Sequence, residues 1–236
     1  MSKPQPQSPI ARRAGLSPER IVDEATALSA EFGLDGWSIR DIAKRLDVVP
    51  SVIYHYFPDK EALCDAVVDV VLSTLQLPDP TLPWKEWFTA LLQGVRPLLL
   101  EYHGITNRLV YGTFPKTSLP MIDTACQKLL DAGFGDCTAV AYSLIVNSAI
   151  HAIGSRELRS PKQAKDRHDL REMLDRLNPM AAESPGLRFM IDTYLQPLSQ
   201  PDRENDMSEE YYRLMIASIL NGVEYTLLAP PADETN

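Results

Sequence analysis

Two predicted helices of only about two turns each, residues 38–46 and 50–56, are joined by the short connection Asp47-Val48-Val49. Ser38 and Asp41 form an S-x-x-D pair that predicts the start of the first helix, and Pro50 favours the start of the second. Helices of this length bury too little surface to be stable alone. They therefore need longer neighbours to hold them, and the connection must turn sharply.

Longer helices are predicted on both sides of this pair. Ser17-Pro18 begins an amphipathic helix that ends at Gly33, and Asp59 caps a helix that runs along the chain to Leu77. Asp47 suits the turn, because aspartate tolerates the left-handed conformation better than most residues. A long helix, a short helix, a turn and a second short helix form the ground plan of a helix-turn-helix unit. The whole chain is predicted to be all-α.

The distribution of charge agrees with a nucleic-acid partner for this part of the chain. The formal net charge is −9, from 23 Lys and Arg against 32 Asp and Glu. Residues 1–60 carry eight residues of each sign, so the entire acidic excess lies after residue 60. The asymmetry between segments is more informative than the total.

Residues 17–63 resemble the DNA-binding domain of the tetracycline-repressor (TetR) family of bacterial transcription regulators. The resemblance is carried by Ser38, Ile42-Ala43, Leu46-x-Val48, Tyr54, Tyr56, Phe57 and Lys60-Glu61-x-Leu63. The chain departs from the family pattern at three places: Asp47 replaces the usual turn glycine, Val49 the usual cap, and Tyr56 a frequent histidine. The base preference is what these departures change.

This resemblance implies a set of DNA contacts on and around the third helix. The predicted DNA-binding residues are Ser38, Arg40, Pro50, Ser51, Val52, Tyr54, His55, Tyr56 and Lys60. Arg40 matches the O6 and N7 atoms of guanine, Val52 is expected to touch a thymine methyl group, and Ser51 suits a base or a phosphate. Tyr54, Tyr56 and Lys60 are expected on phosphate oxygens, and His55 suits either role. Val48, Ile53 and Phe57 are expected to face inward.

The rest of the chain predicts a second helical domain. Helices are expected at residues 84–100, 119–131, 138–153 and 208–228, and the polar segment 156–207 is expected to hold one or two helices between loops. The pieces LLDAGF and SILNGVEYTLL resemble the C-terminal domain of the tetracycline-repressor subclass. That resemblance implies a homodimer in which helices 138–153 and 208–228 of two copies form a four-helix bundle. The expected domains are a flexible basic arm at 1–15, a helix-turn-helix domain at 16–62 and an effector-binding and dimerisation domain at 63–236.

The subclass binds small molecules between helices, so this resemblance also implies an effector pocket. Candidate ligand-binding residues are Trp87, Tyr102, His103, Tyr111, Phe114 and Met121. In VYGTFPKT, Val110 takes the place of the metal-binding histidine of the tetracycline repressor. A metal-free, largely apolar effector is therefore expected, with no cofactor and no metal site.

Composition places the chain among soluble, cytoplasmic proteins. It has 236 residues, 44% of them hydrophobic, no signal peptide and no apolar run that approaches a membrane span of about 20 residues. Its three cysteines, Cys64, Cys126 and Cys137, are odd in number and widely spaced, which disfavours a disulfide framework or a zinc site.

The function predicted from these features is that of a sequence-specific transcriptional regulator. We expect a repressor that leaves a palindromic operator when it binds its effector. Two alternatives stay open: a DNA-binding protein without a small-molecule effector, and an all-helical enzyme that uses His103, His151 or His168. No nucleophile motif or H-x-x-x-H spacing supports the enzyme.

Overall fold

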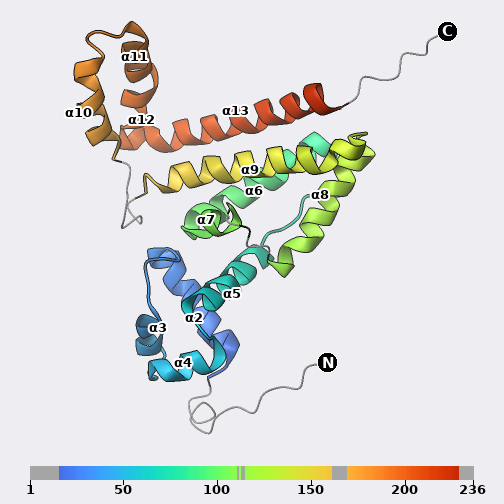
Figure 1. Cartoon of the computed structure of the whole chain (residues 1–236), viewed down its shortest axis with the longest axis vertical. Coiled ribbons are helices and arrows are strands. Elements are labelled where there is room, and N and C mark those ends of the chain that lie inside the picture. The colour runs from blue at the N-terminus through green and yellow to red at the C-terminus, as the bar shows by residue number, and fades with distance from the viewer. Residues whose placement is uncertain (1–15, 111, 113–114, 161–168, 229–236) are drawn as a thin grey trace, which may run out of the picture. The chain divides into compact units, whose positions relative to one another are not determined.

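The computed structural model describes residues 16–110, 112, 115–160 and 169–228, and these residues form helices joined by turns, with no strand among them (Figure 1). The predicted arm, residues 1–15, lies outside the described residues. The described chain divides into two compact units. The first contains residues up to Gln76 together with Glu101–Pro120, and the second contains Leu77–Leu100 and the chain from Met121 onward. The compact units therefore divide at residue 76, and a later segment returns to the first unit, while the expected limit of the DNA-binding domain at residue 62 stays a prediction.

The first unit is built from four helices near the N-terminus and a returning segment. Its elements are α2 (Pro18–Phe32), α3 (Ile39–Arg45), α4 (Pro50–Tyr56), α5 (Lys60–Ser73), α7 (Ile105–Val110) and the 3-10 turn η1 (Lys116–Ser118). Helix α5 ends at Ser73, one turn before the expected end at Leu77. Its buried residues pack against α2 and η1, so α5 serves as the spine of this unit.

Local capping sets the starts of the helices in the first unit. The Ser17 Oγ accepts a hydrogen bond from the Arg20 amide at 3.3 Å, and the Asp59 Oδ1 accepts one from the Ala62 amide at 2.7 Å. Each cap satisfies one of the amide groups that the first turn of a helix leaves unpaired. The predicted caps at Ser17 and Asp59 are therefore confirmed.

The returning segment 101–118 is tied to the first unit by backbone and charged contacts. The Leu34 amide donates to the His103 carbonyl at 2.8 Å. Gly33 has a φ of 77°, and a Cβ there would lie 3.2 Å from the His103 Cβ. The Arg108 guanidinium donates to Glu61 at 2.7 Å and to Asp65 at 3.1 Å. Such contacts explain why the segment belongs with α5 rather than with its neighbours in sequence.

The second unit consists mainly of long helices. Its elements are α6 (Trp84–Glu101), α8 (Leu119–Asp131), the turn η2 (Gly135–Cys137), α9 (Thr138–Glu157), α10 (Leu170–Met180), α11 (Pro185–Met190), the π-helical turn η3 (Ile191–Leu195), α12 (Gln196–Leu198) and α13 (Pro201–Leu227). Helix α8 has the predicted bounds. Helix α9 continues four residues beyond the predicted end, and α13 begins seven residues before the predicted start. The polar segment between them contains more helix than was expected.

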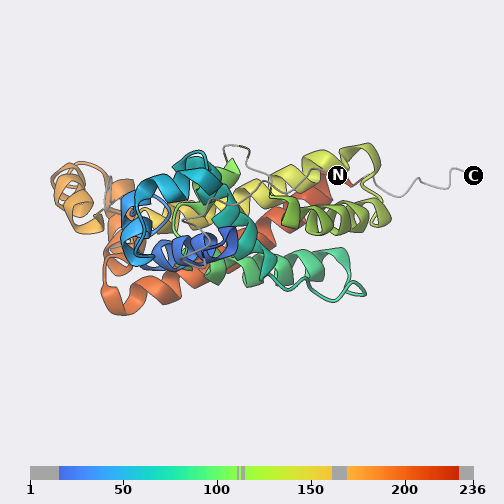
Figure 2. The ribbon, with the colours of Figure 1, turned by 90° about the horizontal axis from the view of Figure 1, so that it is seen from below.

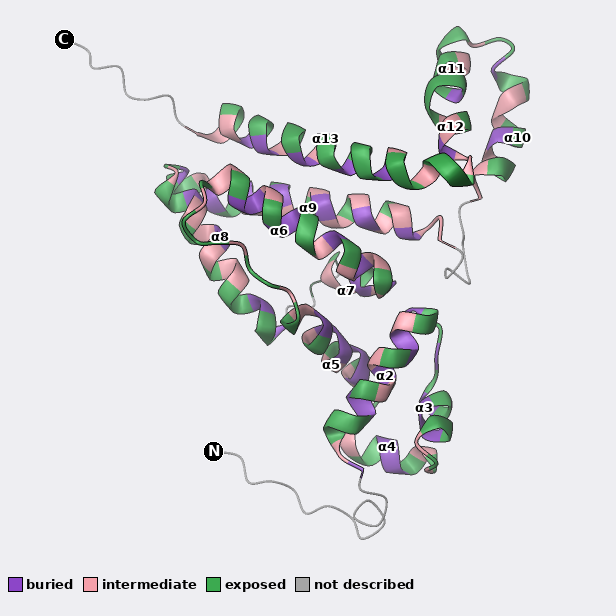
Figure 3. Cartoon of the chain, turned by 180° about the vertical axis from the view of Figure 1, so that it is seen from behind, coloured by how far each residue is buried: buried purple, intermediate pink, exposed green. Residues whose placement is uncertain are grey.

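Helices α9 and α13 lie side by side through much of their length (Figures 1 and 2). Each contributes one buried stripe to their contact. The stripes are Ala141, Ile145, Ala149 and Ile153 on α9 and Tyr212, Ile216, Leu220 and Val223 on α13. Spacings of three and four residues place each set on one helix face. The opposite face of α13 is exposed along its length (Figure 3).

The segment Gly135–Glu157 is long and apolar enough to cross a membrane by length and composition. The expectation that no run of the chain approaches this length is therefore wrong. However, Ile145 and Ala149 are almost fully buried among the described residues, and the helix ends at the charged pair Arg156 and Glu157. Core helices of water-soluble proteins pass the same test; α9 buries 28% of this segment, and its buried stripe packs against α13.

Candidate nucleic-acid interface and ligand cavity

Helices α3 and α4 are set at their angle by a capping box and a left-handed turn. The Ser38 amide donates to Asp41 Oδ2 at 2.8 Å, and the Asp41 amide donates to Ser38 Oγ at 3.4 Å, as an S-x-x-D pair predicts. Asp47 has a φ of 53° and is the one non-glycine residue in the described chain with a positive φ. Both features of the sequence-based prediction are confirmed.

The exposed face of this pair of helices carries most of the predicted DNA-binding residues. Ser38, Arg40, Ser51, Tyr54 and His55 are exposed, and Pro50 is half-buried. Tyr54 leaves 51% of its surface open to solvent. A compact set of hydroxyl, guanidinium and imidazole groups therefore faces outward from one short helix and the start of the other.

Val52 does not belong to this exposed face. The sequence analysis expected its side chain to point toward DNA, but Val52 is only 9% exposed and Ile53 beside it is fully buried. Helix α4 packs against α3, and the face that it buries includes two adjacent residues, Val52 and Ile53. The prediction for Val52 is wrong in orientation. Val49, at the N-cap of α4, is 59% exposed and is the apolar side chain that this helix presents to solvent.

Tyr56 is also used differently from the prediction. Its hydroxyl donates to the Leu16 carbonyl at 3.2 Å, across 40 positions of sequence. The ring of Tyr56 meets that of His55 edge to face, with centroids 5.3 Å apart. Because a tyrosine has a single hydroxyl proton, this bond occupies the donor that a phosphate oxygen would need. Tyr56 therefore anchors the chain before α2 to the end of α4.

Lys60 is held at the start of α5 by an aromatic ring. Its Nζ lies 4.5 Å from the ring centroid of Trp37, which suits a cation–π interaction. Trp37 is itself buried, and its Nε1 donates to Ser29 Oγ at 2.8 Å. Lys60 thus keeps a fixed position near the first amides of α5, where a phosphate is favoured.

Arg45 is a further residue that shapes this surface and that the sequence analysis did not select. Its guanidinium forms ion pairs with Glu24, at 3.1 Å, and with Glu31, both on α2. These pairs fasten α3 to α2 and raise the pKa of Arg45, mainly through the hydrogen bond to Glu31. A cation at this place supports the orientation of the exposed face without being part of it.

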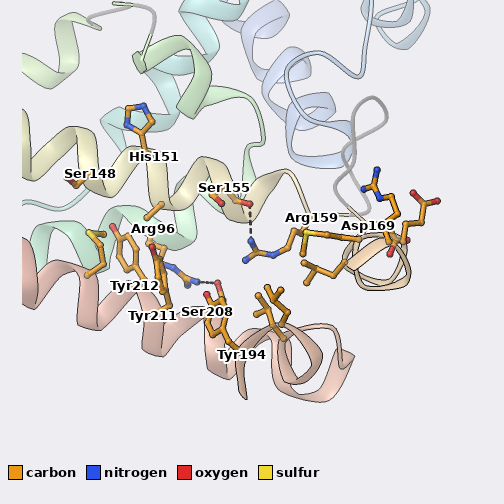
Figure 4. A pocket seen from close by; sticks show the side chains of 18 residues that line it. Arg96, Ser148, His151, Ser155, Arg159, Asp169, Tyr194, Ser208, Tyr211 and Tyr212 are labelled. Atoms are coloured by element: carbon orange, nitrogen blue, oxygen red, sulfur yellow. Dashed lines mark hydrogen bonds between the residues drawn. The ribbon is translucent and has the colours of Figure 1, made fainter. Parts of the chain in front are cut away.

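The second unit contains a cavity of about 940 Å³ between α9, α13 and the segment α10–α12, with Arg96 of α6 in its wall (Figure 4). Its wall combines tyrosines, serines and arginines with leucine, methionine and alanine side chains. The lining includes Arg96, Ser148, His151, Ala152, Ser155, Arg159, Met173, Arg176, Tyr194, Leu198, Ser208, Tyr211, Tyr212 and Met215. This volume is within the range of cavities that hold drug-sized molecules.

Two of the three arginines in the wall of this cavity, Arg96 and Arg159, are paired with carboxylates, and Asp169 and Glu172 also line the wall. Arg96 forms an ion pair with Glu209 and donates to Ser208 Oγ at 3.1 Å, while its guanidinium carbon lies 5.2 Å from the ring centroid of Tyr212. Arg159 Nε lies 3.5 Å from Glu204. The positive charge of the wall is largely balanced, so the cavity suits an uncharged aromatic molecule better than an anion.

Tyr212 connects the cavity to the core of the second unit. Its hydroxyl donates to the Leu92 carbonyl at 3.0 Å, and burial raises the pKa of this phenol well above its ordinary value. The side chain is only 4% exposed. Tyr212 therefore stays protonated, and its one hydroxyl proton is used within the fold by the bond to Leu92.

The predicted ligand-binding residues do not line this cavity. Trp87 is fully buried and His103 is nearly so, while Tyr102 and Met121 are half-buried. Tyr102 and His103 belong to the first unit, and Trp87 and Met121 to the second. Tyr111 and Phe114 lie outside the described residues. The role of these six residues stays a prediction.

Two observations bear on the remaining chemical alternatives. Within the described residues, no group of three or more His, Cys, Asp or Glu side chains is arranged to hold a metal ion. Burial raises the pKa of Cys64 to about 11, so this thiol is not an activated nucleophile.

The comparison with known proteins agrees with the helix-turn-helix geometry. The family model described as "Bacterial regulatory proteins, tetR family" matches residues 21–67. The class A tetracycline repressor from transposon 1721 of Escherichia coli is 28% identical over 185 residues, which span 76% of this chain and 81% of that protein. Residues 21–67 form a DNA-binding domain of the TetR family. This domain is that of a transcription regulator.

Other members of the TetR family match the chain over different lengths. The class C tetracycline repressor of Escherichia coli is 30% identical over 129 residues, but the match spans only 58% of its length. This relative has a higher identity than the class A repressor, but the match covers a smaller part of both proteins.

Solved TetR-family structures have the same fold across both units. The ActR protein of Streptomyces coelicolor, in complex with actinorhodin, matches with a TM-score of 0.65 at 20% identity and covers 88% of this chain and 98% of its own. A TetR variant from Acinetobacter baumannii AYE, in complex with minocycline, matches with a TM-score of 0.65 at 18% identity and covers 94% of this chain and its own full length. The predicted all-α fold is confirmed, and the predicted TetR-family DNA-binding domain is confirmed at residues 21–67.

Proposed function

We propose that this regulator represses transcription by binding a palindromic operator as a homodimer, and that a small molecule releases it. The observation that carries the proposal is the exposed face of α3 and α4, where Arg40, Ser51 and Tyr54 point outward from helices set by the Asp47 turn. The second helix of a helix-turn-helix unit enters the major groove with its N-terminal residues toward the base edges. A regulator that binds operator DNA in a bacterium acts in the cytoplasm, so we place this protein there.

The outer faces of α9 and α13 are suited to pairing with a second copy. Large apolar side chains are exposed there: Val140, Leu144, Leu214 and Tyr225 are 53%, 43%, 50% and 92% exposed. Small residues lie between them, namely Ala139, Ser143, Ser218 and Gly222, and they permit a close approach of helices. Two-fold symmetry would place the two reading helices on half-sites about 34–36 Å apart.

The effector is proposed to bind the cavity of the second unit. A neutral molecule with an aromatic body fits a wall in which Tyr194, Tyr211 and Tyr212 supply rings and the paired arginines supply donors. The relatives bound to actinorhodin and minocycline are consistent with an aromatic ligand, although they share only the fold with this chain. Binding would favour a packing of α10–α13 that differs from the DNA-bound one.

The first experiment tests operator binding. Full-length protein is used to select duplexes from a random DNA library, and binding of the enriched duplex is measured by fluorescence anisotropy at several salt concentrations. We expect a palindromic site and a steep loss of affinity with salt. Arg40→Ala and Tyr54→Ala should weaken binding, with a loss of about 1–3 kcal/mol for Arg40.

Arg203→Ala is the matched control for charge, because Arg203 is an exposed arginine at the start of α13. If Arg40→Ala and Tyr54→Ala both bind the selected operator as tightly as the parent protein, the assigned surface is wrong. If no duplex is enriched, the DNA-binding function itself fails.

The second experiment tests the effector cavity. A library of neutral aromatic compounds is screened for an increase in Tm, and each hit is tested for release of the selected operator. Met173→Trp places a large ring in the cavity and should abolish the effect of the hit while operator binding is kept. Asp175→Trp, on the exposed side of the same helix, should leave the effect unchanged. Release by the hit from the Met173→Trp protein would place the effector elsewhere.

A further inference from the structure

Two valines near the start of α4 differ sharply in exposure. Val52, the third residue of the helix, is 9% exposed, whereas Val49, its N-cap, is 59% exposed. The other outward residues of this helix, Ser51, Tyr54 and His55, all carry polar groups. Val49 is therefore the most exposed apolar side chain at the described start of the reading helix, where the neighbouring Pro50 is half-buried.

Val49 does not serve the stability of the helix that it begins. Its backbone has the extended N-cap conformation, with φ −83° and ψ 147°, but its side chain forms no capping hydrogen bond. Serine, threonine, asparagine or aspartate at an N-cap would satisfy an otherwise unpaired amide. Its side chain is 59% exposed, so capping does not account for valine at this position and packing accounts for it only in small part.

The position of Val49 is one from which base edges are reached. In helix-turn-helix proteins the N-terminal residues of the reading helix contact the base edges, while the first helix of the pair crosses the DNA backbone. The major-groove edge of a thymine carries the C5-methyl group, which is the apolar feature that small aliphatic side chains contact. A β-branched residue presents two methyl groups on a stiff side chain, which suits a contact of this kind.

We propose that Val49 reads a thymine in each half-site through its C5-methyl group, in place of Val52. The inference rests on the proposed binding of operator DNA. It makes Val49 a specificity-determining residue, at the position where this chain departs from the family's usual cap.

The test removes the methyl group from the DNA. In the operator selected with the full-length protein, each thymine is replaced singly by deoxyuridine, which differs from thymine only at C5. We expect one position in each half-site at which the replacement weakens binding roughly fourfold, the effect of removing one buried methyl group. Replacement at both half-sites should weaken binding roughly 15-fold.

Three variants assign the effect to a side chain. With Val49→Ala the sensitivity to deoxyuridine at that position should disappear. With Val49→Ser it should also disappear, while the Tm rises because serine caps α4. With Val52→Ala the sensitivity should remain. The rise in Tm for Val49→Ser shows that lost discrimination does not come from unfolding.

Each other outcome has a definite meaning. If the operator is bound but no deoxyuridine position matters, or if the sensitivity survives in Val49→Ala, the inference is overturned while the regulator function stands. Loss of sensitivity in Val52→Ala alone would return the role to Val52. Failure to enrich any operator would instead reject the proposed function, and this inference with it.

Discussion

In the first unit, the caps Ser17, Ser38 and Asp59 each bind an amide three residues away, whereas Arg96 and Tyr212 in the second unit bind partners 112 and 120 positions distant. The first unit therefore sets its helix starts by contacts within a single turn. In the second unit α10 and α11 also have local caps, but the long helices α9 and α13 have no side-chain cap, and the bonds of Arg96 and Tyr212 join elements far apart in sequence. The geometry of the exposed face of α3 and α4 is therefore set by neighbouring residues. The geometry of the cavity in the second unit depends on contacts across that whole unit.

The largest effect is expected on the face of the second unit that we propose to pair with another copy. Leu144→Glu places a carboxylate on the exposed apolar face of α9, and burying an unpaired charge at an interface is costly. We expect a monomer in sedimentation velocity experiments and a loss of operator affinity on the order of 100-fold, because a single reading helix binds poorly.

The control for Leu144→Glu is Ala182→Glu, which adds the same charge at an exposed position away from α9 and α13. This variant should remain dimeric and bind the operator normally. A Leu144→Glu protein that stays dimeric would show that the two copies meet through another face. The distant contacts that hold α9 and α13 would then not be needed for dimerisation.

A smaller effect is expected at the long-range bond of Tyr212. Tyr212→Phe removes the hydroxyl that donates to the Leu92 carbonyl, and the buried carbonyl loses that partner. The free energy of unfolding in urea should fall by about 1 kcal/mol. Tyr211→Phe is the matched control, since Tyr211 is 52% exposed, and it should change the stability little. Equal effects of the two substitutions would contradict the importance of the distant contact.

The contrast between local and distant contacts also explains what could be predicted from the sequence. The starts of α2, α3 and α5 follow from Ser17, Ser38 and Asp59, because each signal and its target lie in one turn. The left-handed turn follows from Asp47 for the same reason. The exposed positions of Arg40 and Tyr54 then follow from the family pattern of the two short helices.

The cavity could not be predicted in this way. Its wall takes residues from α6, α9, α10, α13 and the turns between α11 and α13, and no short pattern relates Arg96 to Ser208 or Tyr194. The error at Val52 has a similar cause. The period of a helix places Ile53 inward, but only the packing of α4 against α3 shows that Val52 is buried as well. The bond from Tyr56 to Leu16 likewise joins residues that no local signal connects.

A third effect is expected at the Asp47 turn of the first unit, where a substitution should increase the stability of the protein. Asp47 occupies the left-handed region with φ 53°, where glycine is less strained. Asp47→Gly should therefore raise the free energy of unfolding by roughly 0.5 kcal/mol, after the added flexibility of the unfolded chain is counted. Asp35→Gly, at a turn position without a positive φ, should lower it. A loss of stability for Asp47→Gly would mean that the aspartate side chain, rather than its backbone conformation, matters at this turn.

The smallest effect concerns the capping box at Ser38 and its dependence on pH. The hydrogen bond from the Ser38 hydroxyl, followed by that from the Ser38 amide, lowers the pKa of Asp41 from its ordinary value of 3.8. A carboxylate with a lowered pKa in the folded state contributes stability above its unfolded pKa and loses it as the pH falls through the folded pKa. The difference in unfolding free energy between the parent protein and Asp41→Asn should therefore be constant near neutral pH and shrink below about pH 4. Because Asp41 is exposed to solvent, added salt should reduce this difference further. A difference that grows on acidification would have the wrong sign for a cap of this kind, and it would show that the start of α3 is held by packing, as in the second unit.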